Sequence, residues 1–195
     1  MQGSTDRAEI ENILCRERVV RDMEQWDDLA ACYNADSIVD ISWFNGTGAE
    51  FARASAGMTD RLFSFHEIGA TVTDICGNRA LTDTGVAIHL IAEVHGIEVD
   101  CVGYIRSRAR LERKTDKWLM SGLRAVYIHD LMIPLNPSCV PQLDTERLAT
   151  FRRSYRYLAY MLVARGLPAR DDLPGVDQPE TVKALIDAEE KWLQG

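Results

Sequence analysis

The most informative part of the chain runs from Arg79 to Leu111 and reads RALTDTGVAIHLIAEVHGIEVDCVGYIRSRARL. It is rich in β-branched residues, and apolar and polar side chains alternate along both of its halves, which is typical of strands. The dipeptide His95-Gly96 separates the halves and suits a two-residue hairpin loop. The segment therefore predicts two long antiparallel strands, at 79–94 and 97–111.

The neighbouring segments extend this pattern in both directions. Gly77-Asn78 is a turn signal that follows a strand-like segment, and further strands are predicted at 63–76, 118–131 and 37–44. Consecutive hairpins give an antiparallel, strongly curved sheet rather than a parallel one.

Helical periodicity flanks the strands on both sides. Helices are predicted at 6–25, 26–33, 48–60, 148–162 and 177–193. The pairs Asp6/Glu9 and Asp177/Glu180 have the spacing of capping boxes, which mark helix starts.

The order of these elements predicts an α+β fold. Because the N-terminal helices must cover one face of the curved sheet, we expect a cone with an open mouth over residues 1–133. Residues 134–195 are expected to form a C-terminal helical extension packed on the same domain. Cavities in such cones are natural sites for small molecules.

Charge and cysteine content narrow the class of protein. The 195 residues include 22 Lys and Arg against 30 Asp and Glu, a net charge of −8, which disfavours nucleic acid as a partner. No apolar run approaches the roughly 18 residues of a membrane span, and no leader segment is recognisable. The five cysteines form no C-x-x-C pair, as is typical of a reduced intracellular protein. We therefore expect a cytoplasmic protein with no membrane partner.

A few polar residues stand out on otherwise apolar patterns. Asp22 shares a helical stripe with Cys15, Val19 and Trp26, which is unusual for a carboxylate. His66, His89 and Arg124 lie on predicted strands among apolar residues. No two histidines have the spacing of metal ligands on one element, and no P-loop is present, so neither a metal nor a cofactor is expected.

These residues can be combined into proton-transfer chemistry. An Asp beside a His orients the imidazole and stabilises its protonated form, so His66 with Asp22 predicts a general base. An arginine such as Arg124 can stabilise a developing negative charge. Structural roles compete with these functions: Asp22 can pair with Arg18, Arg124 with a buried carboxylate such as Glu17, and His66 can be a core residue.

Several short motifs occur in the order known from one family. They are Trp26-Asp27-Asp28-Leu29, Asp36, Asp40, Gly46-x-Gly48-x-x-Phe51, His66-x-Ile68-Gly69, Gly77-Asn78-Arg79-Ala80 and Lys117-Trp118. Over about residues 5–132 the chain resembles the SnoaL-like branch of the nuclear transport factor 2-like superfamily. Within it, the chain is most similar to scytalone dehydratase and hexachlorocyclohexane dehydrochlorinase.

The resemblance implies a cystatin-like fold and a catalytic dyad of Asp22 and His66, with further substrate contacts from His89 and Arg124. It also implies a cofactor-free lyase that acts on a small hydrophobic or cyclic substrate, and a homodimer or higher homo-oligomer. Arg21 and Ile41 stand where scytalone dehydratase has tyrosines.

The hypothesis we prefer is a dehydratase-like lyase that uses this dyad for proton abstraction and β-elimination. The expected cavity walls are Trp43, Val72, Tyr104, Met120 and Ile128. An isomerase or polyketide-cyclase-like enzyme on the same scaffold, and a non-catalytic ligand-binding or assembly module, remain alternatives.

Overall fold

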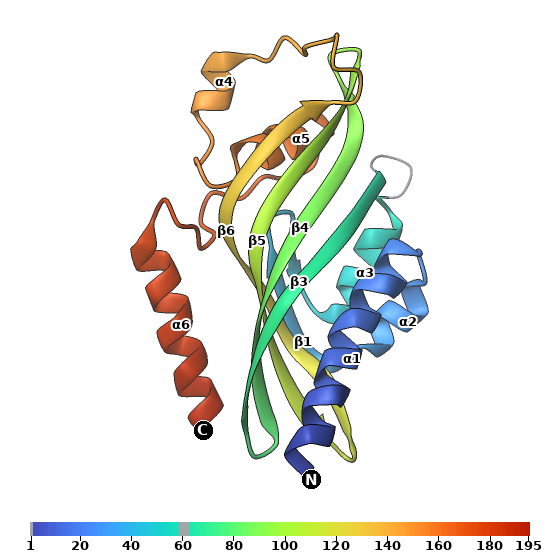
Figure 1. Ribbon diagram of the computed structural model, residues 1–195, viewed down its shortest axis with the longest axis vertical. Helices are drawn as coiled ribbons and strands as arrows, with labels where there is room; N and C mark the ends of the chain where they lie inside the picture. The colour runs from blue at the N-terminus through green and yellow to red at the C-terminus, as the bar shows by residue number, and fades with distance from the viewer. Residues whose placement is uncertain (1, 59–62) are drawn as a thin grey trace.

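A curved sheet of six strands forms the centre of the molecule (Figure 1). The computed structural model describes residues 2–58 and 63–195. The strands are β1 (Tyr33–Ile41), β2 (Phe44–Gly46), β3 (Phe63–Cys76), β4 (Arg79–Val94), β5 (Ile97–Lys114) and β6 (Lys117–Pro134). Their order across the sheet is β2-β1-β6-β5-β4-β3.

The four long strands form the predicted meander of antiparallel hairpins. β3 and β4 have the predicted bounds, and β5 and β6 extend a few residues further. At the β4–β5 loop, His95 and Gly96 have φ angles of 50° and 80°, the positive values that a two-residue hairpin turn requires. The predicted curved α+β architecture is therefore confirmed.

One strand pair departs from the predicted antiparallel sheet, because β1 runs parallel to β6. The chain leaves β1 through β2 and a helix and then enters β3 at the opposite edge of the sheet. β3 runs antiparallel to β1. Because β3 to β6 are four strands that alternate in direction, β6 runs antiparallel to β3 and therefore parallel to β1.

The helices lie on both faces of the sheet (Figure 1). They are α1 (Gln2–Asp22), α2 (Trp26–Ala31), α3 (Gly48–Ala56), α4 (Thr145–Ala149), α5 (Arg156–Ala164) and α6 (Pro179–Gln194). We call the face that carries α1 the inner face. α5 packs on the same face, towards the wide end, whereas α6 contacts the outer face through β3 and β4.

Three helix predictions are wrong in detail. Asp6 is not a cap, because α1 begins before it, and its carboxylate instead accepts hydrogen bonds from Arg113 and Trp118. Asp177 does not cap α6 and accepts from Arg152 and Ser154. The predicted helix 148–162 is two helices, α4 and α5, with turns between them.

The predicted helix over 48–60 corresponds to α3, which ends at Ala56. The residues from 59 onwards of that prediction lie outside the described residues. At its start, Thr47 and Glu50 form a capping box in which each side chain bonds the other's backbone N–H.

Two buried clusters occupy the inner face. One lies beneath α1, α2 and α3 and includes Leu29, Phe51 and Trp118, and the other lies beneath α5 and includes Tyr127 and Leu158. Trp43 packs against both clusters, so the region around it joins the N-terminal helices to the C-terminal extension.

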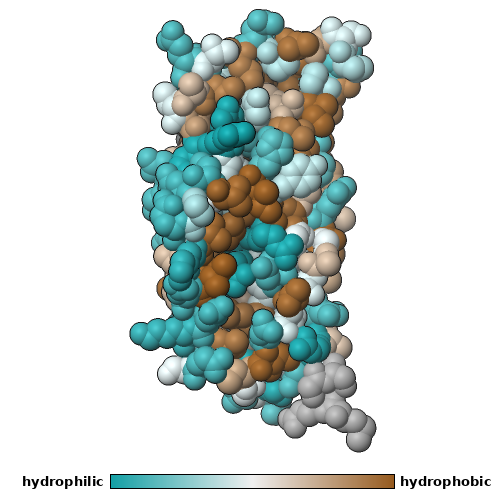
Figure 2. All heavy atoms as spheres, turned by 60° about the vertical axis from the view of Figure 1, so that its left-hand side comes forward, coloured by the Kyte–Doolittle hydropathy of each residue, from teal (hydrophilic) through white to brown (hydrophobic). Residues whose placement is uncertain are grey.

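The opposite side of the molecule has a mixed surface. Figure 2 turns the side that carries α6 forward, and hydrophobic and hydrophilic residues alternate on it. α6 is held there by Glu189, which pairs with Arg108 of β5. Among the described residues, none of the helices has the length and apolar character needed to cross a membrane.

Candidate functional site

Asp22 and His66 form a pair at the end of α1. The imidazole Nδ1 of His66 lies 2.7 Å from one carboxylate oxygen of Asp22, and the backbone N–H of His66 donates to the other oxygen at 2.9 Å. The His66 side chain is 2% exposed and that of Asp22 is 16% exposed. The predicted partnership of these two residues is confirmed.

The position of Asp22 on its helix differs from the one that the predicted apolar stripe implied. Cys15 and Val19 are exposed, so the stripe that Asp22 was expected to share does not face a core. Asp22 reaches His66 because it is the last residue of α1, beside the start of β3. Its alternative partner, Arg18, instead contacts Glu17 at 3.0 Å and Ser107 at 3.3 Å.

The contacts of His66 define its protonation. A guanidinium N–H of Arg21 points at Nε2 of His66 across 3.3 Å. Because a guanidinium can only donate, Nε2 must accept, and the single proton of the ring lies on Nδ1, donated to Asp22. The ring is therefore a neutral imidazole whose basic nitrogen faces Arg21.

The surroundings of His66 shift its pKa in the direction opposite to our expectation. Burial and the positive charge of Arg21 lower the pKa of His66 to about 3, although the hydrogen bond to Asp22 opposes them. We expected Asp22 to stabilise the protonated form, but desolvation and the neighbouring cation outweigh it. For Asp22, burial raises the pKa, but the hydrogen bonds from His66 and the charge of Arg21 outweigh it, so the pKa is lowered.

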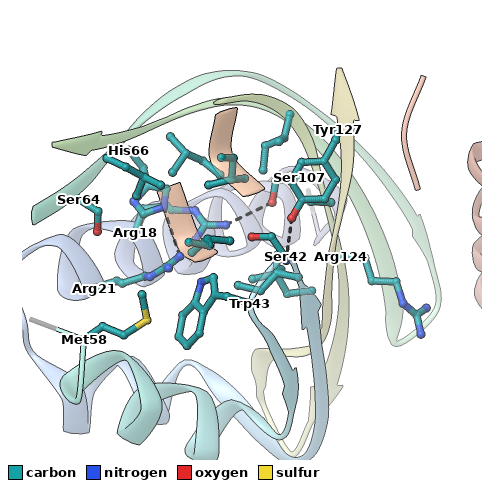
Figure 3. A pocket seen from close by; sticks show the side chains of 18 residues that line it. Arg18, Arg21, Ser42, Trp43, Met58, Ser64, His66, Ser107, Arg124 and Tyr127 are labelled. Atoms are coloured by element: carbon teal, nitrogen blue, oxygen red, sulfur yellow. Dashed lines mark hydrogen bonds between the residues drawn. The ribbon is translucent and has the colours of Figure 1, made fainter. Parts of the chain in front are cut away.

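His66 and Arg21 line a cavity on the inner face (Figure 3). Its space, counted out to open solvent, is about 640 Å³. The remaining lining is mostly apolar and comes mainly from the sheet and from α5: Ile41, Trp43, Met58, Ile88, Leu90, Ile105, Leu123, Leu158 and Leu162.

The C-terminal extension forms part of this cavity. Leu158 and Leu162 of α5, one helical turn apart, are both buried and line it opposite α1. Tyr127 lines it below α5, and its hydroxyl oxygen accepts a hydrogen bond from the backbone N–H of Ser42 at 2.9 Å. The predicted open mouth is therefore partly covered by residues after 134.

Among the predicted wall residues, Trp43 lines the cavity and the others do not. Val72, Tyr104 and Ile128 are exposed, at 59%, 43% and 37%. Met120 is buried in the cluster beneath the N-terminal helices. The prediction that these four residues form the cavity wall is wrong: strand alternation and the bulge beside Tyr104 turn three of them away from the cavity, and Met120 is packed beneath the N-terminal helices instead.

His89 also lies outside the cavity. Its neighbours Ile88 and Leu90 line the inner face, so the alternation of β4 turns His89 to the outer face. There its Nδ1 lies 2.7 Å from Asp100, and its ring stacks on Phe65 at 4.3 Å. The predicted cavity contact of His89 is wrong.

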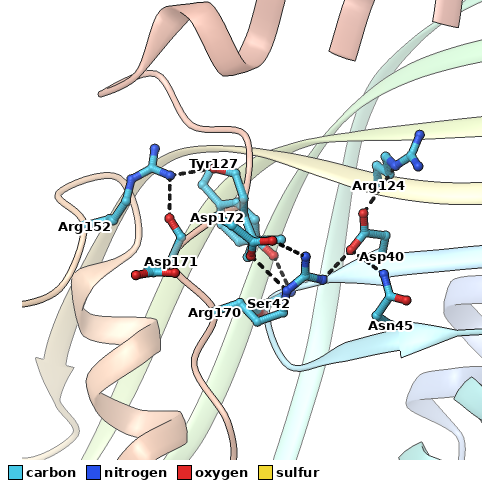
Figure 4. A network of polar contacts seen from close by, with 10 residues as sticks. Asp40, Ser42, Asn45, Arg124, Tyr127, Arg152, Arg170, Asp171 and Asp172 are labelled. Atoms are coloured by element: carbon cyan, nitrogen blue, oxygen red, sulfur yellow. Dashed lines mark hydrogen bonds and ion pairs between the residues drawn. The ribbon is translucent and has the colours of Figure 1, made fainter. Parts of the chain in front are cut away.

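The guanidinium of Arg124 is turned away from the cavity, although the residue borders it (Figures 3 and 4). It pairs with Asp40 at 3.4 Å and not with Glu17. The other oxygen of Asp40 accepts hydrogen bonds from Arg170 of the C-terminal extension and from Asn45. Arg124 therefore belongs to a network that joins β1, β6 and the extension.

The sequence-based reasoning missed two cations of the site. Arg18 and Arg21 are three residues apart on α1 and enter the same cavity. The available signal was their spacing from Asp22 along the same helix. This signal does not show that the helix presents this face to the sheet.

Comparison with known proteins relates the chain to fungal proteins. A PEP2-like protein of Fusarium vanettenii is 32% identical over 206 residues, which cover 97% of this chain and 88% of that protein. Pea pathogenicity protein 2 of the same organism is 30% identical over 160 residues, which cover 80% of this chain and 69% of that protein.

Solved structures share the fold at lower identity. A hexachlorocyclohexane dehydrochlorinase of Novosphingobium barchaimii, LinA-type3, has a TM-score of 0.57 and 16% identity, covering 71% of this chain and 94% of that one. A candidate scytalone dehydratase of Novosphingobium aromaticivorans has a TM-score of 0.54 and 15% identity, covering 73% and 95%. At these identities the likeness is one of fold.

The sequence pattern of the SnoaL-like domain matches residues 2–124, which include all of the N-terminal helices and the strands up to the middle of β6. This match extends over more than half of the chain and includes Asp22 and His66. The chain belongs to the family of SnoaL-like domains.

Proposed function

We propose that the protein is a cofactor-independent lyase in which His66, held by Asp22, removes a proton from a small apolar substrate in the cavity. The observation that carries the proposal is the arrangement of the imidazole: Nδ1–H is fixed by a carboxylate, and the unprotonated Nε2 is on the cavity side, next to Arg21. A buried ring in this tautomer is ready to accept a proton without first losing one.

The proposed step balances as a β-elimination. Nε2 takes the proton from a carbon, the C–H electron pair becomes a new double bond, and the leaving group departs with its own bonding pair. If the leaving group is hydroxide, the proton on His66 can pass to it and form water. If it is a halide, the proton passes to solvent, and in either case His66 returns to its neutral state.

The proposal is supported by the character of the cavity. Its mostly apolar walls suit a small hydrophobic or cyclic substrate, and the positive charges of Arg18 and Arg21 lie close to His66. Elimination is preferred over isomerisation because two solved proteins of the same fold are a dehydrochlorinase and a candidate scytalone dehydratase.

Hydrogen–deuterium exchange tests the proton abstraction directly. Cyclic β-hydroxyketones, chlorinated cyclohexanes and analogues without a leaving group are first screened for binding by ligand-detected NMR. Compounds that bind are then incubated with the protein in D₂O, and mass spectrometry records deuterium uptake and loss of water or HCl. Elimination changes the mass of the product skeleton, whereas isomerisation leaves it unchanged apart from deuterium.

Matched histidine variants assign the chemistry to the dyad. His66→Gln is expected to slow exchange and elimination by roughly 10²- to 10⁴-fold, the usual contribution of a general base. His129→Gln is the control, because His129 is exposed and stacks on Tyr104 outside the cavity. Bound compounds that show no exchange above buffer, or equal rates in wild type and His66→Gln, would contradict the proposal.

A further inference from the structure

Arg21 is a half-buried cation whose charge is not balanced by a direct ion pair. Among residues 2–58 and 63–195, the salt bridges include none to Arg21, and its hydrogen bond goes to a neutral ring. Its guanidinium also lies 4.8 Å from the ring centroid of Phe51. A cation in an apolar cavity is costly unless an anion accompanies it.

The nearest carboxylates are already engaged. Glu17 contacts Arg18 at 3.0 Å and accepts a hydrogen bond from the Tyr33 hydroxyl at 2.8 Å. Asp22 binds His66 through both of its oxygens, on the side of the ring opposite Arg21. Burial and the charge of Arg18 lower the pKa of Arg21, and they outweigh the opposing charges of Glu17 and Asp22.

The cavity lining likewise contains cations without matching anions. Arg18 and Arg21 both border it, and no carboxylate of the described residues does. Serine hydroxyls at Ser64 and Ser107 lie among the same lining residues. The part of the cavity beside His66 therefore offers positive charge and hydrogen-bond donors, and most of the other lining residues offer apolar surface.

We infer that the ligand of this cavity is a small apolar carboxylic acid whose carboxylate binds the guanidinium of Arg21, with its apolar body against Trp43 and α5. A planar guanidinium matches a carboxylate with two parallel hydrogen bonds. This inference rests on the proposed function, because it takes the cavity to be the active site, and it adds the chemical class of the substrate.

A bound carboxylate would also counter the effect of Arg21 on the basicity of His66. With Arg21 uncompensated, protonating Nε2 would place two positive charges 3.3 Å apart. A bound carboxylate neutralises Arg21, and the groups around the ring then comprise Asp22, Arg21 and the ligand anion, with Arg18 paired to Glu17. The ligand thereby raises the basicity of the histidine that acts on it.

Paired acids and amides test the inference. Benzoate, phenylacetate and trans-cinnamate are compared with benzamide, phenylacetamide and trans-cinnamamide by isothermal titration calorimetry on the full chain at pH 7. Each amide keeps the shape of its acid and removes the charge. The ring ¹⁵N signals of His66 report whether the bound acid lies in this cavity, because that ring contacts Arg21.

The expected result is that at least one acid binds about 10-fold or more tightly than its amide and shifts the His66 signals. Arg21→Met should weaken the acid by about 10- to 100-fold and leave the amide unchanged. Arg16→Met is the matched control, because Arg16 lies on the same helix with 54% of its side chain exposed. His66→Gln should retain acid binding while losing proton abstraction, which separates this inference from the proposed function.

Three results would overturn the inference: acids and amides that bind wild type equally, acids that do not bind, or Arg21→Met with wild-type affinity for the acid. The first two use the unaltered protein and stay decisive even if Arg21→Met does not fold. In that case Arg21→Lys provides the variant, and it should weaken the acid because an ammonium lacks the paired donors of the guanidinium.

Discussion

The neutral state of His66 makes the stability of the protein depend on pH in a calculable way. In the folded protein the pKa of His66 is lowered from 6.5 to about 3, whereas in the unfolded chain it keeps its ordinary value near 6.5. As the pH falls below about 6.5, the unfolded state therefore binds a proton that the folded state does not. The stabilisation is fully present above pH 6.5 and decreases steadily towards pH 3.

The magnitude follows from the two pKa values. Between pH 7 and pH 5 the unfolded histidine goes from about one-quarter protonated to almost fully protonated, and the folded one stays neutral. Integrating this difference gives a loss of about 2 kcal/mol in the free energy of unfolding, with a slope near 1.4 kcal/mol per pH unit at the acid end. A folded pKa one unit higher changes this value little.

Urea unfolding at pH 7 and at pH 5 measures this loss in wild type, His66→Gln and His129→Gln. We expect wild type and His129→Gln to lose about 2 kcal/mol more than His66→Gln over this range. An equal loss in wild type and His66→Gln would refute the reasoning, because His66 would then titrate alike in the folded and unfolded states.

Three further predictions concern the dyad, the docking of the C-terminal extension and the cavity. Asp22→Asn should slow exchange at bound ligands by roughly 100-fold, because an amide cannot hold the Nδ1–H tautomer of His66, and the D₂O assay measures it. Asp40→Asn should cost about 1.5–3 kcal/mol at pH 7 through its bonds to Arg170, measured by urea unfolding. Since bonds from Arg170 and Asn45 outweigh burial and lower the pKa of Asp40, its contribution should be fully present above about pH 4 and be lost as the pH falls further, through the lowered pKa of the folded state. Leu162→Ala should cost about 2–5 kcal/mol and enlarge the cavity, which thermal unfolding and binding of bulkier ligands would show.

Exposed positions provide the controls for these variants. Asp27→Asn and Leu135→Ala change exposed side chains and should alter stability by less than about 1 kcal/mol. If Asp40→Asn were as mild as Asp27→Asn, the network of Figure 4 would not hold the extension. A Leu162→Ala variant as stable as Leu135→Ala would contradict the burial of α5, and unchanged exchange in Asp22→Asn would remove Asp22 from the mechanism.

The central strands could be predicted from local pattern because their signals are local. Alternation along β3 and β4 and the turn residues between them depend only on neighbouring residues, and the observed bounds agree. The parallel pairing of β1 with β6 depends on how the chain returns across the sheet, which no local pattern specifies. The break between α4 and α5 arises likewise from long-range contacts, such as that of Arg152 with Asp177.

The candidate site was only partly predictable for a similar reason. Asp22 and His66 could be paired through the resemblance to known dyads, and the structure brings them together. The alternation of β4 grouped His89 with apolar residues, but both faces of that strand carry apolar residues, so periodicity could not identify the inner one. Arg124 pairs with Asp40, which also binds Arg170, and these three residues are far apart in the sequence.

The protonation state of His66 tests the central claim most directly, because a general base must be neutral and carry its free nitrogen on the cavity side. Two-dimensional ¹H–¹⁵N NMR of histidine-labelled protein assigns the proton to Nδ1 or Nε2 and follows both nitrogens with pH. The account predicts a proton on Nδ1, an unprotonated Nε2 and no titration of this ring between pH 7 and pH 5. A His66 that carries its proton on Nε2, or that becomes charged near pH 6.5, would contradict it.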